Sequence, residues 1–543
     1  MMVVQLDSYA VEAKFDGINW TDITADVIDT ISWKYGILGS GPLDRIGDPG
    51  EMSIKLNNTE TNSGGVTGYY TPGHPLCRVG FTVGLPVRLT ATYNGETRTK
   101  FYGTIPSDGI IIQTGRYSKR VVEVTVKDWM YQASIHELVL PEFTQNKTIT
   151  EVVALILANM VRQPLATDYR IGNEAFAYIF DTTRTTTRAM SEFAKVALSE
   201  LGYIYITRRG GDEVLRVEGR YTRNDEVTSA TTLPVAIGSK LTTEDGDYII
   251  TENGLDYLVT NEVFTPSFDN SMYDLTTPYG KDLYNRIKAT TYPRVIGADA
   301  TTILFSLNSP ISLSPGASAT FTGRYRDPTG IYEDVAGTDM QAPIATTDYL
   351  MNANEDGTGT DLTANLTVVV TYGVTSAVYT LTNTSVSTGY VTKLNAVGRG
   401  IYTDDPVDSI IEDATSIALV GTSQLTLDMK YQDNPLDSEG IATLLLARYK
   451  DAKVIPDTVS FYANRSAVLM SCFMQFEPGD RIELQEEVSN TNADYFIQGI
   501  EASINPGGFI KFTWFIKDAG FDSFNFAVWD VSTWDQVNST WGF

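Results

Sequence analysis

The sequence contains many acidic residues but few of the other side chains that commonly carry out catalysis. Its 543 residues include 67 aspartates and glutamates, two cysteines and two histidines, His74 and His136. A Ser-His-Asp triad or a multi-histidine metal site would need one of these histidines, and a structural histidine is the simpler interpretation at each. The sequence contains no Gly-x-x-x-x-Gly-Lys-Ser/Thr loop, no Gly-x-Ser-x-Gly elbow and no Cys-x-x-Cys pair. We therefore expect neither catalytic residues nor a cofactor, and predict that the protein is not an enzyme.

One short segment has the spacing of a calcium ligand set. Asn352, Asn354 and Asp356, followed by Gly357, match the first half of a calcium loop. Thr363 stands where the bidentate glutamate of such a loop belongs. Runs of Asn, Asp and Gly are more often ordinary turns. The three residues are thus a calcium candidate of low specificity, and we predict no metal site.

The charge of the chain limits its partners. The formal net charge is −27 and the isoelectric point about 4.4. Affinity for nucleic acid comes largely from Lys and Arg, so specific nucleic-acid binding is not expected. The net negative charge has two possible roles. It either keeps the protein soluble, or it lines a passage through which nucleic acid moves without binding.

Other compositional features exclude two further classes of protein. Cys77 and Cys472 are too few for a disulfide scaffold, and we interpret them as reduced thiols. The most apolar run, from Val152 to Val161, is much shorter than the ~20 residues of a membrane helix. The first residues lack the basic and apolar regions of a signal peptide. We expect neither a membrane span nor secretion.

Residues that favour β-strands are abundant throughout the chain. The chain has 30 Tyr and many Thr and Val residues, which predicts a mainly β, multidomain protein. Residues 1–140 read as all-β, with a two-residue hairpin at Asn94-Gly95 between 87–93 and 96–102. Residues 141–290 read as a small α+β module. Its first helix follows a Thr148/Glu151 capping box, its second ends near Gly202, and short strands with acidic turns lie within 241–262.

The second half of the chain reads as three further parts. Residues 291–402 are rich in Thr, Ser, Gly and Val, and their turn spacing predicts an inserted β-sandwich of immunoglobulin type. Residues 403–520 return to α+β character, with a helix that Asp437 could cap. Residues 521–543 form an aromatic tail with Trp529, Trp534 and Trp541, whose rings we expect to dock on this chain or on another protein.

Two blocks of motifs, one near each end, resemble a known family. The first comprises Trp20-x-Asp22-Ile23-Thr24, Trp33-x-Tyr35-Gly36, Gly41-Pro42-x-Asp44-Arg45-Ile46, Pro49-Gly50 and the stretch from Asn62-Ser63-Gly64 to Tyr70-x-Pro72-Gly73-His74. The second comprises Asn434-Pro435, Gly479-Asp480-Arg481-Ile482, Tyr495-Phe496-Ile497-x-Gly499-Ile500 and Pro506-Gly507-Gly508 followed by Thr513-Trp514. In this order they resemble the tail hub, or minor tail, proteins of long-tailed bacteriophages. No motif is specific alone; their order across the chain is the stronger signal.

This resemblance implies a fold, a set of partners and a location. The fold would contain two hub β-barrels, one from each end of the chain, and three subunits would form a ring at the tail tip. Partners would be the distal tail or tail tube protein, the tape measure protein, and fibre or spike proteins, with DNA passing through an acidic lumen. The protein would be a virion component assembled in the host cytoplasm. Tyr69 and Tyr70, at a Gly/Pro-rich corner, are the first candidates for contacts between subunits.

Two other functions fit parts of the sequence. A receptor- or carbohydrate-binding adhesin would use the inserted sandwich, which predicts an aromatic platform on 291–402, although the strands there contain no Trp. A glycan-cleaving tail enzyme would need two close carboxylates in one cleft. Nothing besides the number of acids argues for the enzyme, and pairs of acids arise by chance at this density.

Overall fold

A computed structural model describes residues 4–115, 120–139, 144–170, 172, 174–180, 186–220, 222–225, 267–268, 272–332 and 335–519. The aromatic tail, with Trp529, Trp534 and Trp541, and the acidic turns of 241–262 lie outside the described residues.

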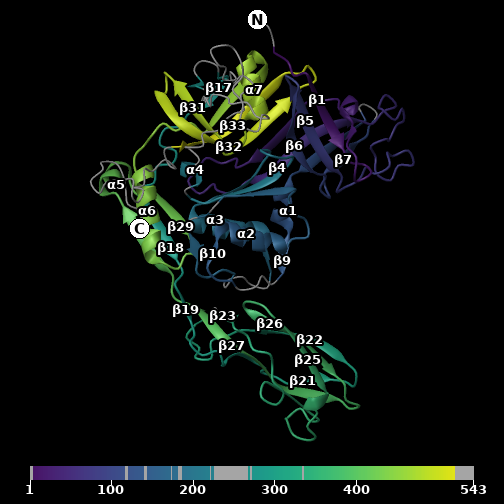
Figure 1. Ribbon diagram of the computed structural model, residues 1–543, viewed down its shortest axis with the longest axis vertical. Helices are drawn as coiled ribbons and strands as arrows, with labels where there is room; N and C mark the ends of the chain where they lie inside the picture. Colours follow the sequence, from purple (N-terminus) through teal and green to yellow (C-terminus); the bar gives the residue numbers. More distant parts are fainter. Residues whose placement is uncertain are drawn as a thin grey trace, which may run out of the picture.

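Strands from both ends of the chain form one large sheet, and the prediction of a mainly β protein is confirmed (Figure 1). Strand β3 (Ile31–Gly36) pairs antiparallel with β32 (Thr491–Ile504), from Ile31 opposite Ile504 to Gly36 opposite Gly499. The 14-stranded sheet runs in the order β17 (Asp274–Thr276), β30 (Thr458–Tyr462), β33 (Ile510–Asp518), β32, β3, β4 (Asp48–Asn57), β8 (Val121–Lys127), β6 (Glu96–Thr104), β5 (Pro86–Tyr93), β1 (Ser8–Ala13) and β2 (Thr21–Asp22), with β31 (Arg481–Glu486), β16 (Ser267–Phe268) and β7 (Ile110–Gln113) at its side.

The path of this sheet is open at both ends. No sheet of the described residues closes into a barrel, so the two separate barrels predicted from the sequence are not confirmed. One core underlies both halves: Trp33 lies 6.2 Å from Phe473, ring centroid to ring centroid. Phe473 belongs to helix α7 (Ala467–Gln475), which Ser466 caps through its side chain. The long-range β3–β32 pairing therefore merges segments that the sequence suggests are separate domains.

The central module packs three helices against a small sheet. Helices α1 (Trp129–Ile135), α2 (Ile149–Ala158) and α3 (Ala189–Glu200) share a core with β15 (Val214–Glu218) and β14 (Tyr203–Thr207). Strand β11 (Ala166–Tyr169) extends this sheet by pairing parallel with β15. The Thr148/Glu151 capping box is confirmed. The left-handed residue after α3 is Leu201 rather than Gly202. Gly202 serves close approach instead, since a Cβ there would lie 2.5 Å from the Glu218 carbonyl oxygen. The short pairs β9 (Glu137–Val139) with β13 (Thr186–Arg188), and β10 (Lys147–Thr148) with β12 (Ala175–Phe176), flank the helices.

A third unit lies beside this module. Its sheet consists of β28 (Val407–Glu412), β18 (Arg286–Thr291) and β29 (Gln424–Asp428), and α6 (Pro435–Tyr449) packs on it. Asn434, not the expected Asp437, caps α6, because its side chain accepts a hydrogen bond from Leu436 N. Helix α5 (Ala414–Val420) joins β28 to β29, and among the described residues no helix is long and apolar enough to span a membrane.

The insert projects from the rest of the chain in Figure 1. Its 15-residue strand β27 (Gly389–Thr403) pairs with β19 (Arg294–Ile296), β20 (Thr302–Ser306), β21 (Ile311–Leu313), β23 (Val335–Thr338) and β24 (Tyr349–Asn352). A second sheet has the order β22 (Ser318–Arg324), β26 (Ser376–Asn383), β25 (Leu366–Tyr372). Both sheets contribute to one core, so the insert is a two-layer β structure; its immunoglobulin type is not confirmed.

The hairpin between β5 and β6 has the predicted turn. Asn94 and Gly95 have φ angles of 51° and 77°, as a type I′ turn requires. Tyr93 pairs with Glu96 across the turn. The local sequence was therefore sufficient to predict this turn.

We expect Gly36→Ala to disrupt the contact between the two ends of the chain. Gly36 has a φ of 87°, and a Cβ there would lie 2.7 Å from the Gln498 carbonyl oxygen. Strain and clash should together cost about 2–3 kcal/mol of unfolding free energy, measured by urea denaturation. Gly440→Ala in α6 is the control, because a Cβ there meets nothing within 4 Å and helix propensity favours alanine. Equal losses in both variants would contradict the argument.

Candidate functional site

A buried charged junction joins the N-terminal strands, the central module and the C-terminal segment. At its centre is Glu477, which is 4% exposed. Its Oε2 accepts hydrogen bonds from Tyr35 Oη at 2.7 Å and from Arg208 N at 3.1 Å. The ammonium group of Lys100 lies 3.7 Å from Oε1 and donates to the Phe473 carbonyl at the end of α7 at 2.8 Å. One carboxylate thus contacts groups up to 442 residues away in sequence.

The polypeptide after Glu477 completes this junction. Asp480 accepts a hydrogen bond from Glu477 N at 2.9 Å and forms an ion pair with Arg209. Burial raises the pKa of Asp480, and the Arg209 charge opposes that rise. Gly479 passes so close to Tyr205 that a Cβ would lie 2.4 Å from the tyrosine oxygen. In the Gly479-Asp480 motif, the glycine therefore allows the backbone to approach Tyr205 closely, and the aspartate pairs with Arg209.

A second buried carboxylate organises the interior of the central module. Glu218 accepts hydrogen bonds from Tyr205 Oη at 2.8 Å, Arg216 Nε at 2.6 Å and Arg223 Nε at 2.8 Å. Burial acts to raise its pKa, but Arg223 and Arg216 outweigh burial and lower the pKa to about 2. The Glu218 carboxyl is therefore ionised at neutral pH, and its negative charge pairs with Arg216 and Arg223.

Two further acids lie at the start of α1. Asp128 caps this helix and accepts from Gly50 N at 2.8 Å and Met130 N at 3.1 Å, while Glu213 accepts from Trp129 N at 2.9 Å. Burial raises the pKa of Asp128 to about 6 and that of Glu213 to about 7, against the nearby Arg208 charge. All five of these buried acids, Glu477, Asp480, Glu218, Asp128 and Glu213, accept hydrogen bonds from protein donors. The arrangement is suited to joining segments.

Of the residues predicted to contact partners, Tyr70 lies in the core. It is fully buried, and its hydroxyl donates to Asp26 Oδ2 at 2.5 Å. Asp26 also accepts from Ser63 N at 2.7 Å, which anchors the glycine-rich loop. Tyr69 is half-buried and packs edge-on against Tyr70 at 5.1 Å between ring centroids. Tyr70 therefore supports the corner, whereas Tyr69 stays a predicted contact residue.

An exposed apolar surface lies beside this corner. A Cβ on Gly80 would lie 2.1 Å from the Phe15 carbonyl oxygen, and one on Gly84 would lie 3.9 Å from the Arg162 guanidinium, so three segments are adjacent. We call their exposed residues the rim patch: Ile18, Leu76, Val79, Val83, Val161 and Leu165. Val79 and Val161 are each 90% exposed. Sequence patterns could not have grouped them, because the segments lie far apart in the chain. Exposed apolar side chains on neighbouring segments are candidates for a contact surface.

The calcium candidates do not converge on one point. Asp356 Oδ1 accepts from Thr358 N at 2.9 Å, and Asn354 Nδ2 donates to Thr358 Oγ1 at 3.0 Å. Asn352 instead accepts from Thr392 Oγ1 at 2.9 Å on the neighbouring strand. Within the described part of the chain, no group of three or more His, Cys, Asp or Glu residues could hold a metal ion. The segment has the hydrogen bonding of an ordinary turn.

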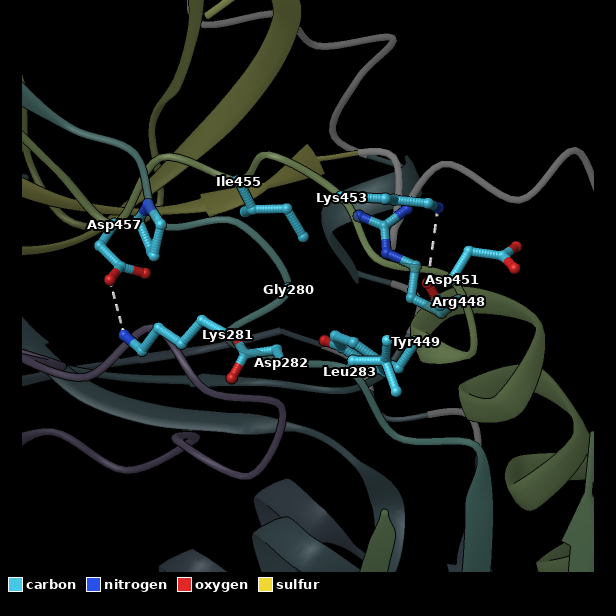
Figure 2. Close-up of a pocket in the computed structure, with 11 residues that line it drawn as sticks. Gly280, Lys281, Asp282, Leu283, Arg448, Tyr449, Asp451, Lys453, Ile455 and Asp457 are labelled. Atoms are coloured by element: carbon cyan, nitrogen blue, oxygen red, sulfur yellow. Dashed lines mark hydrogen bonds and ion pairs between the residues drawn. The ribbon is translucent and has the colours of Figure 1, made fainter. Parts of the chain in front are cut away.

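A small pocket lies where the loop before β18 meets the segment after α6 (Figure 2). Lys281 Nζ lies 2.6 Å from Asp457, which also accepts from Ser40 Oγ at 2.7 Å. Burial raises the pKa of Asp282 on the pocket wall. The enclosed space of about 10 Å³ has room for roughly one water molecule. The pocket is thus a packed contact among three chain segments and too small for a ligand.

Comparison with known proteins gives similarity in structure alone. No family model matches this sequence, and no curated protein matches it either. The chain is similar to a tail protein from Neisseria meningitidis MC58, at 8% identity and a TM-score of 0.46, over 95% of this chain and 98% of the other. It is also similar to the 43 kDa tail protein of prophage MuSo2 from Shewanella oneidensis, at 8% identity and a TM-score of 0.44, over 94% and 98% of the chains. A third similarity is to prophage tail protein gp18 from Listeria monocytogenes EGD-e, at 8% identity and a TM-score of 0.37, over 94% of each chain.

We expect Glu477→Ala to destabilise the protein by about 3 kcal/mol or more, because Lys100 would remain buried without its counter-charge. Urea denaturation would measure the loss. Glu487→Ala, at an exposed position of the next turn, is the control and should change little. Adding Lys100→Met to Glu477→Ala should recover part of the loss, since it removes the unpaired cation. Failure of this second change to recover stability would refute the electrostatic explanation.

The acids around α1 predict a pH dependence of stability. Their ordinary pKa values are 3.8 and 4.5, and the folded values are about 6 for Asp128 and 7 for Glu213. Because the folded state holds these protons more tightly, their stabilising contribution is complete below about pH 4 and is lost as the pH rises through 6 and 7. Thermal midpoints between pH 5 and 8 should therefore vary less in Glu213→Gln than in the original protein. Glu137→Gln, at an exposed position, should leave the profile unchanged; an unchanged profile in Glu213→Gln would contradict the assignment.

Proposed function

We propose that this protein is a structural component of a bacteriophage tail, the trimeric hub at the tail tip. Its partners would be the distal tail or tail tube protein, the tape measure protein, and fibre or spike proteins. The role is structural rather than enzymatic, and the protein would reside in the virion after assembly in the host cytoplasm. The proposal starts from the order of motifs that resembles the hub family.

The observation that carries this proposal is the direct pairing of the two motif blocks. Tyr35 and Gly36 of the first block lie opposite Ile500 and Gly499 of the second, on β3 and β32. Asp480, also of the second block, takes part in the buried junction. Motifs recognised separately at the two ends thus meet in one sheet. Such a body could transmit force between neighbours above and below it without separating its own ends.

The rim patch is the surface that we assign to contacts between subunits in the trimer. Its side chains come from three segments, and an aliphatic surface gains free energy when another subunit covers it. Tyr69, at the adjoining corner, would extend this contact. The two hub barrels implied by the resemblance would then require strands from neighbouring subunits or from residues outside the described part.

The net charge fits a role in DNA passage. A trimer of chains with a charge of −27 each would repel DNA from any surface that lines its lumen. We propose that the acidic surface forms part of the channel. A basic lumen in an assembled particle would refute this part of the proposal.

The mass of the purified protein tests the assembly directly. Light scattering should give three times the chain mass of 59.7 kDa, and the same chain should be found in tail particles. Val79→Asp with Val161→Asp should shift the mass toward the monomer, because each carboxylate would be buried at the contact. Val386→Asp, at a position 97% exposed in the insert, is the matched control and should remain trimeric. A monomer that is absent from particles would overturn the proposal.

A further inference from the structure

An open groove runs between the two sheets of the insert. Its walls are β20 from one sheet and β22 from the other, with the polypeptide that follows each strand. The cavity has a volume of about 700 Å³, within the range of small-molecule sites. A hydrogen bond from Arg326 N to the Leu304 carbonyl, at 2.7 Å, links the two walls. The groove is therefore a cleft built into the insert.

The floor of this groove is aromatic. Phe305 and Phe321 are both half-buried, and their ring centroids lie 5.7 Å apart at an interplanar angle of 40°. Each ring also packs against the core of the insert, which holds it in position. Half-buried rings offer an apolar face to a ligand at little cost in conformational entropy.

The rim of the groove supplies hydrogen-bonding groups. Asn308, Ser309 and Thr322 are polar residues that line the groove, and Asn308 and Ser309 are exposed. Ser306 Oγ lies 3.0 Å from Asn395 Oδ1. The side chains of Asn308, Ser309 and Thr322 can both donate and accept hydrogen bonds, as ligand hydroxyl groups require.

The charge of the groove is opposite to that of the chain. Arg324 and Arg326 line it, and none of its described lining residues is acidic. Arg324 takes part in an interaction within the protein, so Arg326 is the positive charge that we assign to a ligand. In a protein with 67 acidic and 40 basic residues, this lining selects an anionic ligand. A guanidinium group matches a carboxylate through two parallel hydrogen bonds.

We propose that this groove binds an acidic saccharide, a sugar chain that carries carboxylate groups such as uronic acid units. The phenylalanine faces would pack on the C–H surface of a sugar ring, the rim would hydrogen bond its hydroxyls, and Arg326 would bind its carboxylate. Nucleic acid fits less well, because two arginines in a chain of −27 supply little phosphate neutralisation. The insert that carries the groove projects from the rest of the chain (Figure 1).

Calorimetry on the full chain tests this proposal with trigalacturonic acid as the probe. Saturable binding is expected, together with no binding of maltotriose, a neutral sugar of the same length. Arg326→Ala should weaken binding at least tenfold. Lys393→Ala removes one positive charge from β27, outside the groove, and should bind as the original protein does.

Four results would overturn the proposal. The first three are the absence of galacturonate binding, equal binding of the neutral sugar, and full binding by Arg326→Ala. The fourth is equal binding of inorganic polyphosphate, which would indicate charge attraction without sugar recognition. The trimer mass and the presence in tail particles do not depend on the groove, so failure here is distinguishable from failure of the hub assignment.

Discussion

Burial of the Glu477 carboxylate is the constraint on which this architecture depends. A carboxylate removed from water costs several kcal/mol unless donors and counter-charges replace its hydration. Here the replacements are the Tyr35 hydroxyl, the Arg208 backbone amide and the Lys100 ammonium, which come from three distant parts of the chain. Each of those groups is itself costly to leave unpaired. The contact of the N-terminal strands, the central module and the C-terminal segment therefore stabilises all three.

This constraint explains why the large sheet is continuous. With Tyr35 held by Glu477, strand β3 is aligned with β32, and the contact of Gly36 with Gly499 allows the two backbones to approach closely. The pairing then extends outward on both sides through antiparallel neighbours. The insert is attached to this assembly through β19 and the end of β27, which pair with each other. Its groove and the rim patch thus lie on different units, so one chain can assemble and bind a ligand through separate surfaces.

The distribution of charge fits the same division of roles. Buried acids in the junction are matched by arginine and lysine, whereas the large excess of acids over bases contributes the net charge of −27. The rim patch is largely aliphatic, and the described lining of the groove contains arginine but no acid. The rim patch and the groove are the two surfaces that we assign to contacts with other molecules.

The sequence by itself determined the local features. The Asn94-Gly95 turn, the Thr148/Glu151 cap and the mainly β character follow from backbone preferences within a few residues, and the structure has all three. The start of α6 was predicted less accurately, because Asn434 rather than Asp437 caps this helix.

Only the tertiary structure decided which segments meet. The pairing of β3 with β32, the ligands of Glu477 and the burial of Tyr70 against Asp26 join residues that are 44 to several hundred positions apart. A tyrosine in a glycine-rich loop has the same local pattern whether it faces solvent or a buried aspartate, so its exposure could not be predicted from its neighbours in sequence. The rim patch and the saccharide groove arise in the same way, because each is lined by segments that become adjacent only after long-range strand pairing.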